Sequence, residues 1–250
     1  MNAVRRFFII LFSLVCVGGI IYALYPVAAG RYLEHQYTAE AENFLYHTIP
    51  ATIAHVDDPE RRPGVVSVPV KYQALLQAMR DYNERIYAEN QVGLSDAWAY
   101  QTPSFDLAAY GIEDGIVGVI YIPALDVELP IYLGASNENM AKGAVHLSQT
   151  SLPIGGVNTN AVIAAHRGWY DAAFFRYIEK LRPGDKLTIT NLWETLTYEV
   201  TEIKIIDPND IDEILIQPGK DMVTLLTCHP YASGGRQRYV VYCERTGAPS

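Results

Sequence analysis

A short apolar segment near the C-terminus most strongly constrains how this chain folds. The run from residue 223 to Cys228 is apolar and β-prone, as a buried strand would be. His229, Pro230 and a glycine-rich turn follow it, and then a second apolar run, 239–242, begins just after Arg238. The two runs predict neighbouring strands with a thiol where the first strand gives way to a loop. A side chain in such a place is held rigidly and still meets a substrate.

Cys228 is a candidate nucleophile if a base or a cation converts it to a thiolate, because a free cysteine is only a few per cent thiolate at neutral pH. A further strand-like run, 160–165, ends in His166. Cys228, His166 and Arg238 would then form one site of nucleophile, proton-transfer group and oxyanion stabiliser. Charged His166 or Arg238 would favour the thiolate. The set suits acyl transfer through a thioester.

Other residues of the same types compete for these roles. His229 is next to the cysteine, but adjacent residues of a strand point to opposite faces, so it is a weak candidate for the base. His146 is interpreted as structural. Arg236 and Arg238 are two residues apart and would face the same side of a strand, so spacing alone does not separate them.

The pentapeptide Thr224-Leu225-Leu226-Thr227-Cys228 resembles the Thr-Leu-x-Thr-Cys signature of the sortases, the membrane-anchored cysteine transpeptidases of Gram-positive bacteria. His166 stands where that family has its histidine and Arg238 where it has its arginine, so the resemblance favours Arg238. Arg236 is the runner-up for that role, or a substrate-binding neighbour that binds a carboxylate. The likeness covers roughly residues 115–245. It includes three further blocks, at 120–123, 129–134 and 143–156.

Two of these segments are similar to class C, the pilin-polymerising sortases: His166-Arg167-Gly168 and the block 150–156. Class C enzymes carry a lid before the barrel, and the segment containing Asp96 and Trp98 resembles it. In that lid Asp96 would face a cation or the thiol, and Trp98 would cover the pocket. Ala97 stands where the family usually has proline. Many class C members also have a C-terminal hydrophobic segment, which this sequence lacks before it ends at Ser250.

The resemblance implies cleavage of a Leu-Pro-x-Thr-Gly-type sorting signal between Thr and Gly and transfer of the acyl group to an amine. In class C the amine is a pilin lysine; in a housekeeping sortase it belongs to a cell-wall precursor. Two rivals are a cysteine protease that transfers to water and a non-enzymatic adhesin or pilus subunit with Cys228 merely buried. No cofactor is expected, and scattered histidines without a Cys-x-x-Cys motif give no support for a metal site.

The N-terminus predicts a membrane anchor. Arg5 and Arg6 precede an apolar stretch from Phe7 to about Tyr25, which at ~1.5 Å per residue nearly spans a ~30 Å hydrocarbon core. The arginines place the N-terminus inside and the domain outside, as a single-pass protein of the cell membrane. A cleavable signal is the competing interpretation, because small residues follow at 28–30.

The net charge bears on the binding partners, and the cysteines bear on whether a disulfide forms. The net charge is −9, and removing Arg5 and Arg6 from 19 basic residues leaves 17 against 28 acids, or −11, beyond residue 28. Such an acidic domain argues against nucleic acid. Cys16 lies in the apolar stretch, and Cys228 and Cys243 are either a disulfide or a free thiol and a buried strand residue. The signature favours the free thiol.

The chain divides into three expected parts: the anchor at 1–28, a helical region with an irregular connection and the lid at 29–114, and the catalytic barrel at 115–250. The overall class is mostly β with helical additions, a closed sortase-type barrel of about eight strands behind N-terminal helices. Within it the patterns predict helices at 32–46, 72–86 and 172–180 and a strand at 186–189.

Overall fold

The structure is a computed structural model that describes residues 3–48, 70–95 and 102–247 of the 250-residue chain. Its centre is a closed barrel of eight strands in the order β1-β2-β3-β4-β7-β8-β6-β5. The barrel that the resemblance implied is therefore confirmed. The strands are β1 (Ile116–Ile122), β2 (Val127–Leu133), β3 (Ala144–His146), β4 (Thr159–Ala164), β5 (Lys186–Thr190), β6 (Thr195–Ile206), β7 (Asp221–His229) and β8 (Gln237–Arg245).

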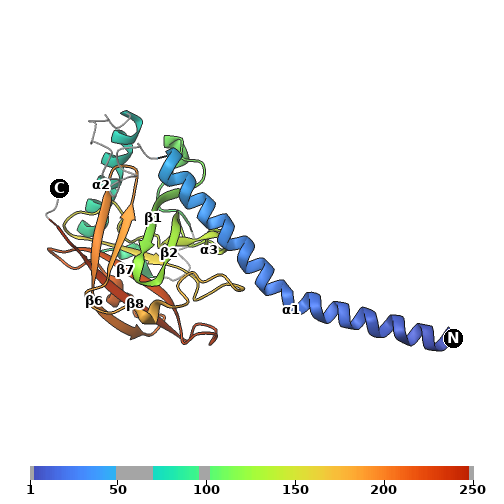
Figure 1. Ribbon diagram of the computed structural model, residues 1–250. Helices are drawn as coiled ribbons and strands as arrows, with labels where there is room; N and C mark the ends of the chain where they lie inside the picture. The colour runs from blue at the N-terminus through green and yellow to red at the C-terminus, as the bar shows by residue number, and fades with distance from the viewer. Residues whose placement is uncertain (1–2, 49–69, 96–101, 248–250) are drawn as a thin grey trace.

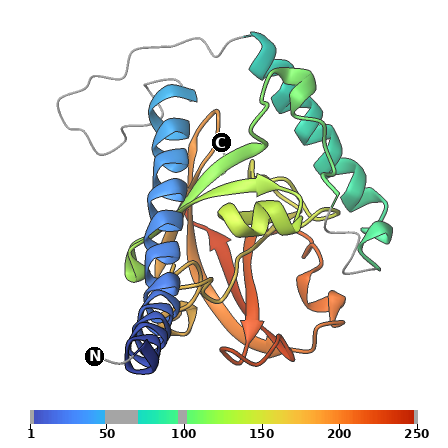
Figure 2. The ribbon, with the colours of Figure 1, turned by 90° about the vertical axis from the view of Figure 1, so that its right-hand side faces the viewer.

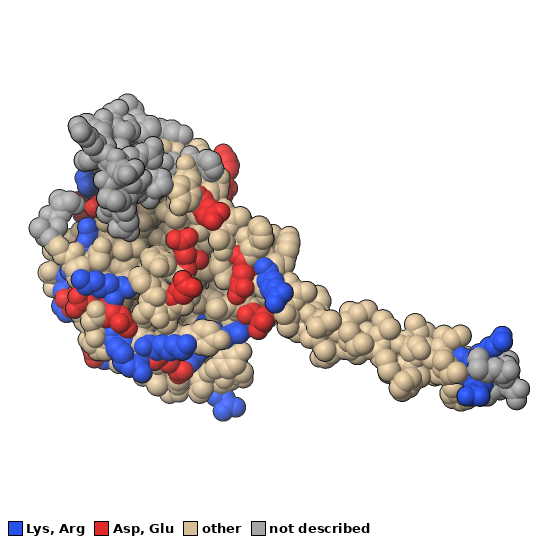
Figure 3. All heavy atoms as spheres, viewed as in Figure 1, with Lys and Arg blue, Asp and Glu red and all other residues tan. Residues whose placement is uncertain are grey.

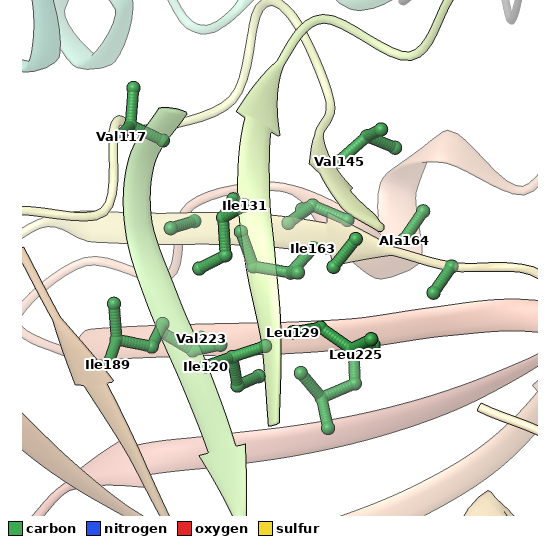
Figure 4. Packing of buried hydrophobic residues seen from close by; sticks show 14 of the residues in the cluster. Val117, Ile120, Leu129, Ile131, Val145, Ile163, Ala164, Ile189, Val223 and Leu225 are labelled. Atoms are coloured by element: carbon green, nitrogen blue, oxygen red, sulfur yellow. The ribbon is translucent and has the colours of Figure 1, made fainter. Parts of the chain in front are cut away.

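The apolar runs form strands because a strand can bury the side chains of one face in the barrel interior. Ile120, Leu129, Ile131, Ile163 and Leu225 are fully buried and meet inside the barrel (Figure 4). β4 is buried along its whole length and pairs in parallel with β7, as expected of a strand covered on both faces. This pairing places the two sequence segments that carry the candidate histidine and cysteine side by side.

On β7 and β8, the side chains of the even-numbered residues point away from the barrel interior. Met222 and Val240 pack there with Tyr242 and Ile206 in a small separate cluster. A short 3-10 helix, η7 (Ile211–Ile214), lies in the connection between β6 and β7. Residues 228 and 238 continue the even-numbered, outward alternation, so both side chains point out of the barrel.

A long N-terminal helix, α1 (Ala3–Asn43), runs without interruption through Pro26 and ends in a π-helical turn, η1 (Phe44–Thr48). Figure 1 shows its first half projecting from the barrel and its second half lying along it. Tyr132 of β2 donates a hydrogen bond to Glu40, which ties the second half to the barrel wall. Within the described residues, α1 is the one helix long and apolar enough to cross a membrane.

The amphipathic helix predicted at 72–86 is confirmed as α2 (Val70–Ala88). Its apolar stripe, which includes Leu75, Met79 and Ile86, is buried against the domain. Figure 2 shows α1 and α2 on opposite sides of the barrel. A third, short helix, α3 (Asn137–Lys142), connects β2 and β3.

The helix predicted at 172–180 is wrong. The segment is a series of turns, and only Ile178–Lys180 forms a short 3-10 helix, η6. Trp169 and Ala172 exchange two backbone hydrogen bonds, and Phe174 has a positive φ of 43°. Both Phe174 and Phe175 are buried, so packing of consecutive aromatic rings in the core overrides the helical pattern.

The sequence analysis did not identify β6, although this twelve-residue strand alternates buried and partly exposed residues over its first half. It pairs with β5 on one side and β8 on the other and so closes the barrel. The alternation of Leu196, Tyr198 and Val200 was the signal that would have predicted it.

Candidate active site

Cys228 and Arg238 are directly opposite each other on β7 and β8. Opposite residues of an antiparallel pair have Cβ atoms about 4.5–5.5 Å apart and share a face, so the ladder itself brings the thiol and the guanidinium together. Cys228 is exposed, whereas its neighbour Thr227 is buried. The β7–β8 ladder thus presents the thiol to solvent from a rigid base.

Gly235 lies against both side chains. A Cβ at this position would be 3.1 Å from Cys228 Sγ and 3.1 Å from Arg238 Nη1, and its φ is +75°. Arg238 Nη1 donates to the carbonyl oxygens of Gly235 at 2.7 Å and Gln237 at 3.1 Å. The turn before β8 therefore needs glycine, both for its backbone conformation and for the close approach.

His166 follows the end of β4. Ala164 pairs with Leu226, and the Ala165 N–H donates to the Leu226 carbonyl at 3.2 Å. Thr227 Oγ1 then donates to the Ala165 carbonyl at 2.7 Å. Because parallel strands in register run level with each other, two further residues along each bring His166 level with Cys228.

The imidazole of His166 is held by aromatic rings. It stacks on Trp169 with centroids 4.5 Å apart and planes at 11°, and Phe174 meets it edge-on at 6.3 Å. Burial lowers the pKa of His166 from its usual 6.5. The neutral ring is therefore favoured at rest, which leaves Arg238, and not charged His166, as the permanent cation beside the thiol.

We call residues 165–181 the histidine loop. Its shape depends on contacts with itself, such as the hydrogen bond of 3.0 Å from Phe175 N to the His166 carbonyl. It also depends on α1: the Tyr37 ring lies 5.5 Å from that of Phe174. At Gly30 a Cβ would be 2.6 Å from Asp171 Cβ, so α1 touches the loop backbone closely.

The sequence analysis did not identify Arg167 as a site residue. Its side chain is 4% exposed and forms a salt bridge with Glu179. Nη1 donates to the Cys228 carbonyl at 3.2 Å and to His229 Nδ1 at 2.7 Å. Arg167 thus connects the histidine loop to the backbone of the cysteine. The signal in the sequence was an arginine directly after the candidate histidine, at the end of an apolar run.

The other candidates for the base and for the oxyanion stabiliser are placed differently from His166 and Arg238. His229 takes its hydrogen bond from Arg167 on the face of β7 opposite Cys228. Arg236 is exposed in the turn before β8 begins at Gln237, so it is not part of the strand, contrary to expectation. His146 is fully buried, with Nε2 2.9 Å from the Ser151 carbonyl and 3.1 Å from Thr150 Oγ1, and burial lowers its pKa to about 4.

All three cysteines are free, so the disulfide alternative for Cys228 and Cys243 is wrong. Cys243 is fully buried and pairs with Val223, five positions along the ladder from the site. Burial raises the pKa of its thiol well above the usual range. Cys228 is therefore the exposed thiol of the barrel.

The segment predicted to be a lid, with Asp96 and Trp98, lies outside the described residues. Across the ranges that are described, no cluster of three or more histidine, cysteine, aspartate or glutamate side chains is arranged to hold a metal ion. The arrangement of thiol, imidazole and guanidinium is one that acyl-transfer chemistry uses.

The barrel region matches a known protein family. Residues 120–246 match the Sortase domain family. Sortase D of Bacillus subtilis is 32% identical over 130 residues, which are 51% of this chain and 63% of that protein, so less than two thirds of its length is spanned.

Two solved structures illustrate the likeness of the fold. The lid mutant of Streptococcus agalactiae sortase C1 is similar with a TM-score of 0.63 and 31% identity, covering 72% of this chain and 92% of that one. The pilus-related sortase C of Group B Streptococcus has a TM-score of 0.57 and 35% identity, covering 68% and 91%. Fold, signature cysteine and matched domain agree, and the chain belongs to the sortase family.

Proposed function

We propose that this chain is a cysteine transpeptidase that cleaves a Leu-Pro-x-Thr-Gly-type sorting signal between Thr and Gly. The observation that carries the proposal is the cross-strand pair of Cys228 and Arg238, with His166 two residues beyond Ala164, the last residue of β4 that pairs with β7. A nucleophile, a proton-transfer group and a fixed cation are the parts that thioester chemistry needs.

Each of the three residues has its own role in the proposed reaction. Neutral His166 takes the proton of the Cys228 thiol, and the thiolate attacks the carbonyl carbon of Thr. Arg238 stabilises the negative oxygen that forms. His166 then gives its proton to the departing amine of Gly as the C–N bond breaks, which leaves a thioester. An incoming neutral amine attacks the thioester, its proton passes to His166, and the thiolate leaves.

We further propose that the amine is a pilin lysine, as in class C. Support comes from the similarity to structures described as sortase C, one of them as pilus-related. The alternative acceptor, a cell-wall precursor amine, would make the chain a housekeeping-type sortase. Offering both acceptors to the same thioester and weighing the products by mass spectrometry decides between them.

The apolar part of α1 supports membrane anchoring. Its flanking Arg5 and Arg6 favour a cytoplasmic N-terminus with the barrel outside the cell. Figure 3 shows that the projecting part of α1 is without charged side chains between its basic tip and the domain. The enzyme would then meet its substrates on the outer face of the membrane.

We also propose that the segment with Asp96 and Trp98 forms a lid over the site. Support comes from the similarity to a solved structure described as a lid mutant of Streptococcus agalactiae sortase C1. If Asp96 and Trp98 close the site, replacing both with alanine should speed alkylation of Cys228 by a small thiol reagent. An unchanged alkylation rate would show that the two residues do not cover the thiol.

The decisive experiment is Cys228→Ala in a peptide-cleavage assay with and without an added amine. We expect a loss of at least about 10³-fold in rate, because the covalent route is removed. Cys16→Ala is the matched control and should be fully active. Products joined to the amine support a transpeptidase, whereas products joined only to water indicate a protease. Near-normal turnover by Cys228→Ala would overturn the proposal.

A further inference from the structure

The apolar stretch of α1 ends beside the histidine loop. Tyr25, the last residue of the predicted membrane span, meets Tyr170 edge-on with ring centroids 5.7 Å apart. Tyr170 in turn meets Trp169 edge-on at 5.5 Å, and Trp169 stacks on His166. An unbroken series of ring contacts therefore leads from the end of the span to the candidate catalytic imidazole.

These rings are exposed to an unusual degree for large side chains. Trp169 is 39% exposed, Tyr170 49%, Tyr25 57% and Tyr22 84%. Tyr231, 55% exposed, lies close by, because Arg176 of the histidine loop covers its ring at 5.9 Å. Tryptophan and tyrosine combine an apolar body with a polar end, and they are enriched where a membrane meets water.

The rise of α1 gives the height of each contact above the hydrocarbon. The 19 residues from Phe7 to Tyr25 span about 28 Å, close to the ~30 Å hydrocarbon core. Gly30, which touches Asp171 and Ala172, is about 7.5 Å further along the helix. The headgroup layer on each side of a bilayer is roughly 5–8 Å thick. If this stretch crosses a bilayer, residues 169–172 would therefore lie at the depth of the headgroups.

Charge at this place is compatible with that depth. Asp171, the acidic residue of the segment, pairs with Arg176 at 3.5 Å. Arg176 also donates to the carbonyl oxygens of Tyr170 and Ala172, which satisfies polar backbone groups of the turn. The tip of the loop thus presents aromatic rings beside a neutralised charge pair.

We infer that Trp169 and Tyr170 rest in the outer headgroup layer of the bilayer, so that the active site operates at the membrane surface. The inference rests on the membrane anchoring proposed above. Tyr37, which contacts Phe174 of the same loop, is about 18 Å beyond Tyr25 along the helix. His166 contacts both Trp169 and Phe174, so it works at most about that far above the hydrocarbon, and closer if the helix tilts.

The test uses the full chain reconstituted in phosphatidylcholine liposomes, with and without bromine atoms on the acyl chains just below the headgroups. Flotation of the liposomes first shows whether the chain is anchored. Bromine quenches tryptophan that it contacts, so we expect lower emission from the parent in brominated liposomes. With Trp98 replaced by phenylalanine throughout, the variant Trp169→Phe should lose most of this difference, whereas Trp193→Phe should keep it, since Trp193 donates to the Tyr72 carbonyl of α2.

A second variant tests whether loss of quenching in Trp169→Phe comes from unfolding of that variant. Moving the indole by one position, in Trp169→Phe/Tyr170→Trp, should restore quenching. If Trp169→Phe is quenched like the parent, or if the shifted indole stays unquenched in a cooperatively melting protein, the loop does not touch the bilayer. Failure of flotation overturns the inference and the anchoring together. Peptide cleavage is measured separately, so retained activity leaves the transpeptidase proposal standing in either case.

Discussion

The two halves of the candidate site are built in different ways. Cys228 and Arg238 belong to the β7–β8 ladder, in which eight consecutive residue pairs fix the position of every side chain. His166 lies beyond the last paired residue of β4, and the histidine loop holds it by ring stacking and turns. Backbone pairing fixes Cys228 and Arg238, whereas side-chain packing holds His166.

The difference shows where each half is vulnerable. A strand pair tolerates changes at its surface because main-chain hydrogen bonds maintain the register. A loop held by side-chain contacts moves when one contact is lost, and α1 contacts the loop at Tyr25, Gly30 and Tyr37. The histidine half therefore depends on a helix that lies far from it in the sequence.

The largest effect is expected in the strand half. Arg238→Ala removes the cation opposite Cys228 and should lower kcat/KM by about 10²–10³-fold, the usual result of losing one oxyanion donor. Melting temperature should change little. Arg236→Ala is the control, because Arg236 is exposed in the turn before β8. A dead Arg236→Ala enzyme beside an active Arg238→Ala enzyme would reverse the two roles.

The loop half is best disturbed from outside, at Gly30 of α1. A Cβ there would be 2.8 Å from Ala172 N, so Gly30→Ala must displace the helix or the loop. We expect kcat/KM to fall about tenfold or more, since a 1 Å misplacement can cost about 10²-fold. Gly19→Ala is the matched control, because nothing lies within 4 Å of that position. Equal activity of the two variants would show that α1 does not position the histidine.

The smallest effect concerns pH. Burial holds the pKa of His166 below 6.5, so neutral His166, the form proposed to take the thiol proton, persists on mild acidification. Trp169→Ala exposes the ring and should raise that pKa towards 6.5, which moves the acidic limb of the kcat/KM profile to higher pH. The change in this pKa by itself should alter kcat/KM at neutral pH by less than about tenfold. An acidic limb that stays in place would mean that another group controls it.

Much of the strand half could be predicted from the sequence. The period of two in a strand fixes which residues share a face, and the family signature identifies the cysteine and its opposite arginine. The sequence analysis did not identify Arg167, and its helix at 172–180 is wrong, for one physical reason. Both depend on tertiary contacts, with Glu179 and Cys228 for the arginine and with the barrel core for Phe174.

The separation of the two barrel cysteines has a consequence for the oxidation of Cys228. Cys243 is opposite Val223, five residues along β8 from Arg238, or about 17 Å, and it faces the barrel interior. A sulfenic acid formed on Cys228 by peroxide therefore has no second thiol of the barrel within reach to convert it into a reversible disulfide. Further oxidation to the sulfinic acid is permanent for most proteins. A small thiol from the surroundings would therefore have to react with the sulfenic acid before a second oxidation makes the loss of Cys228 permanent.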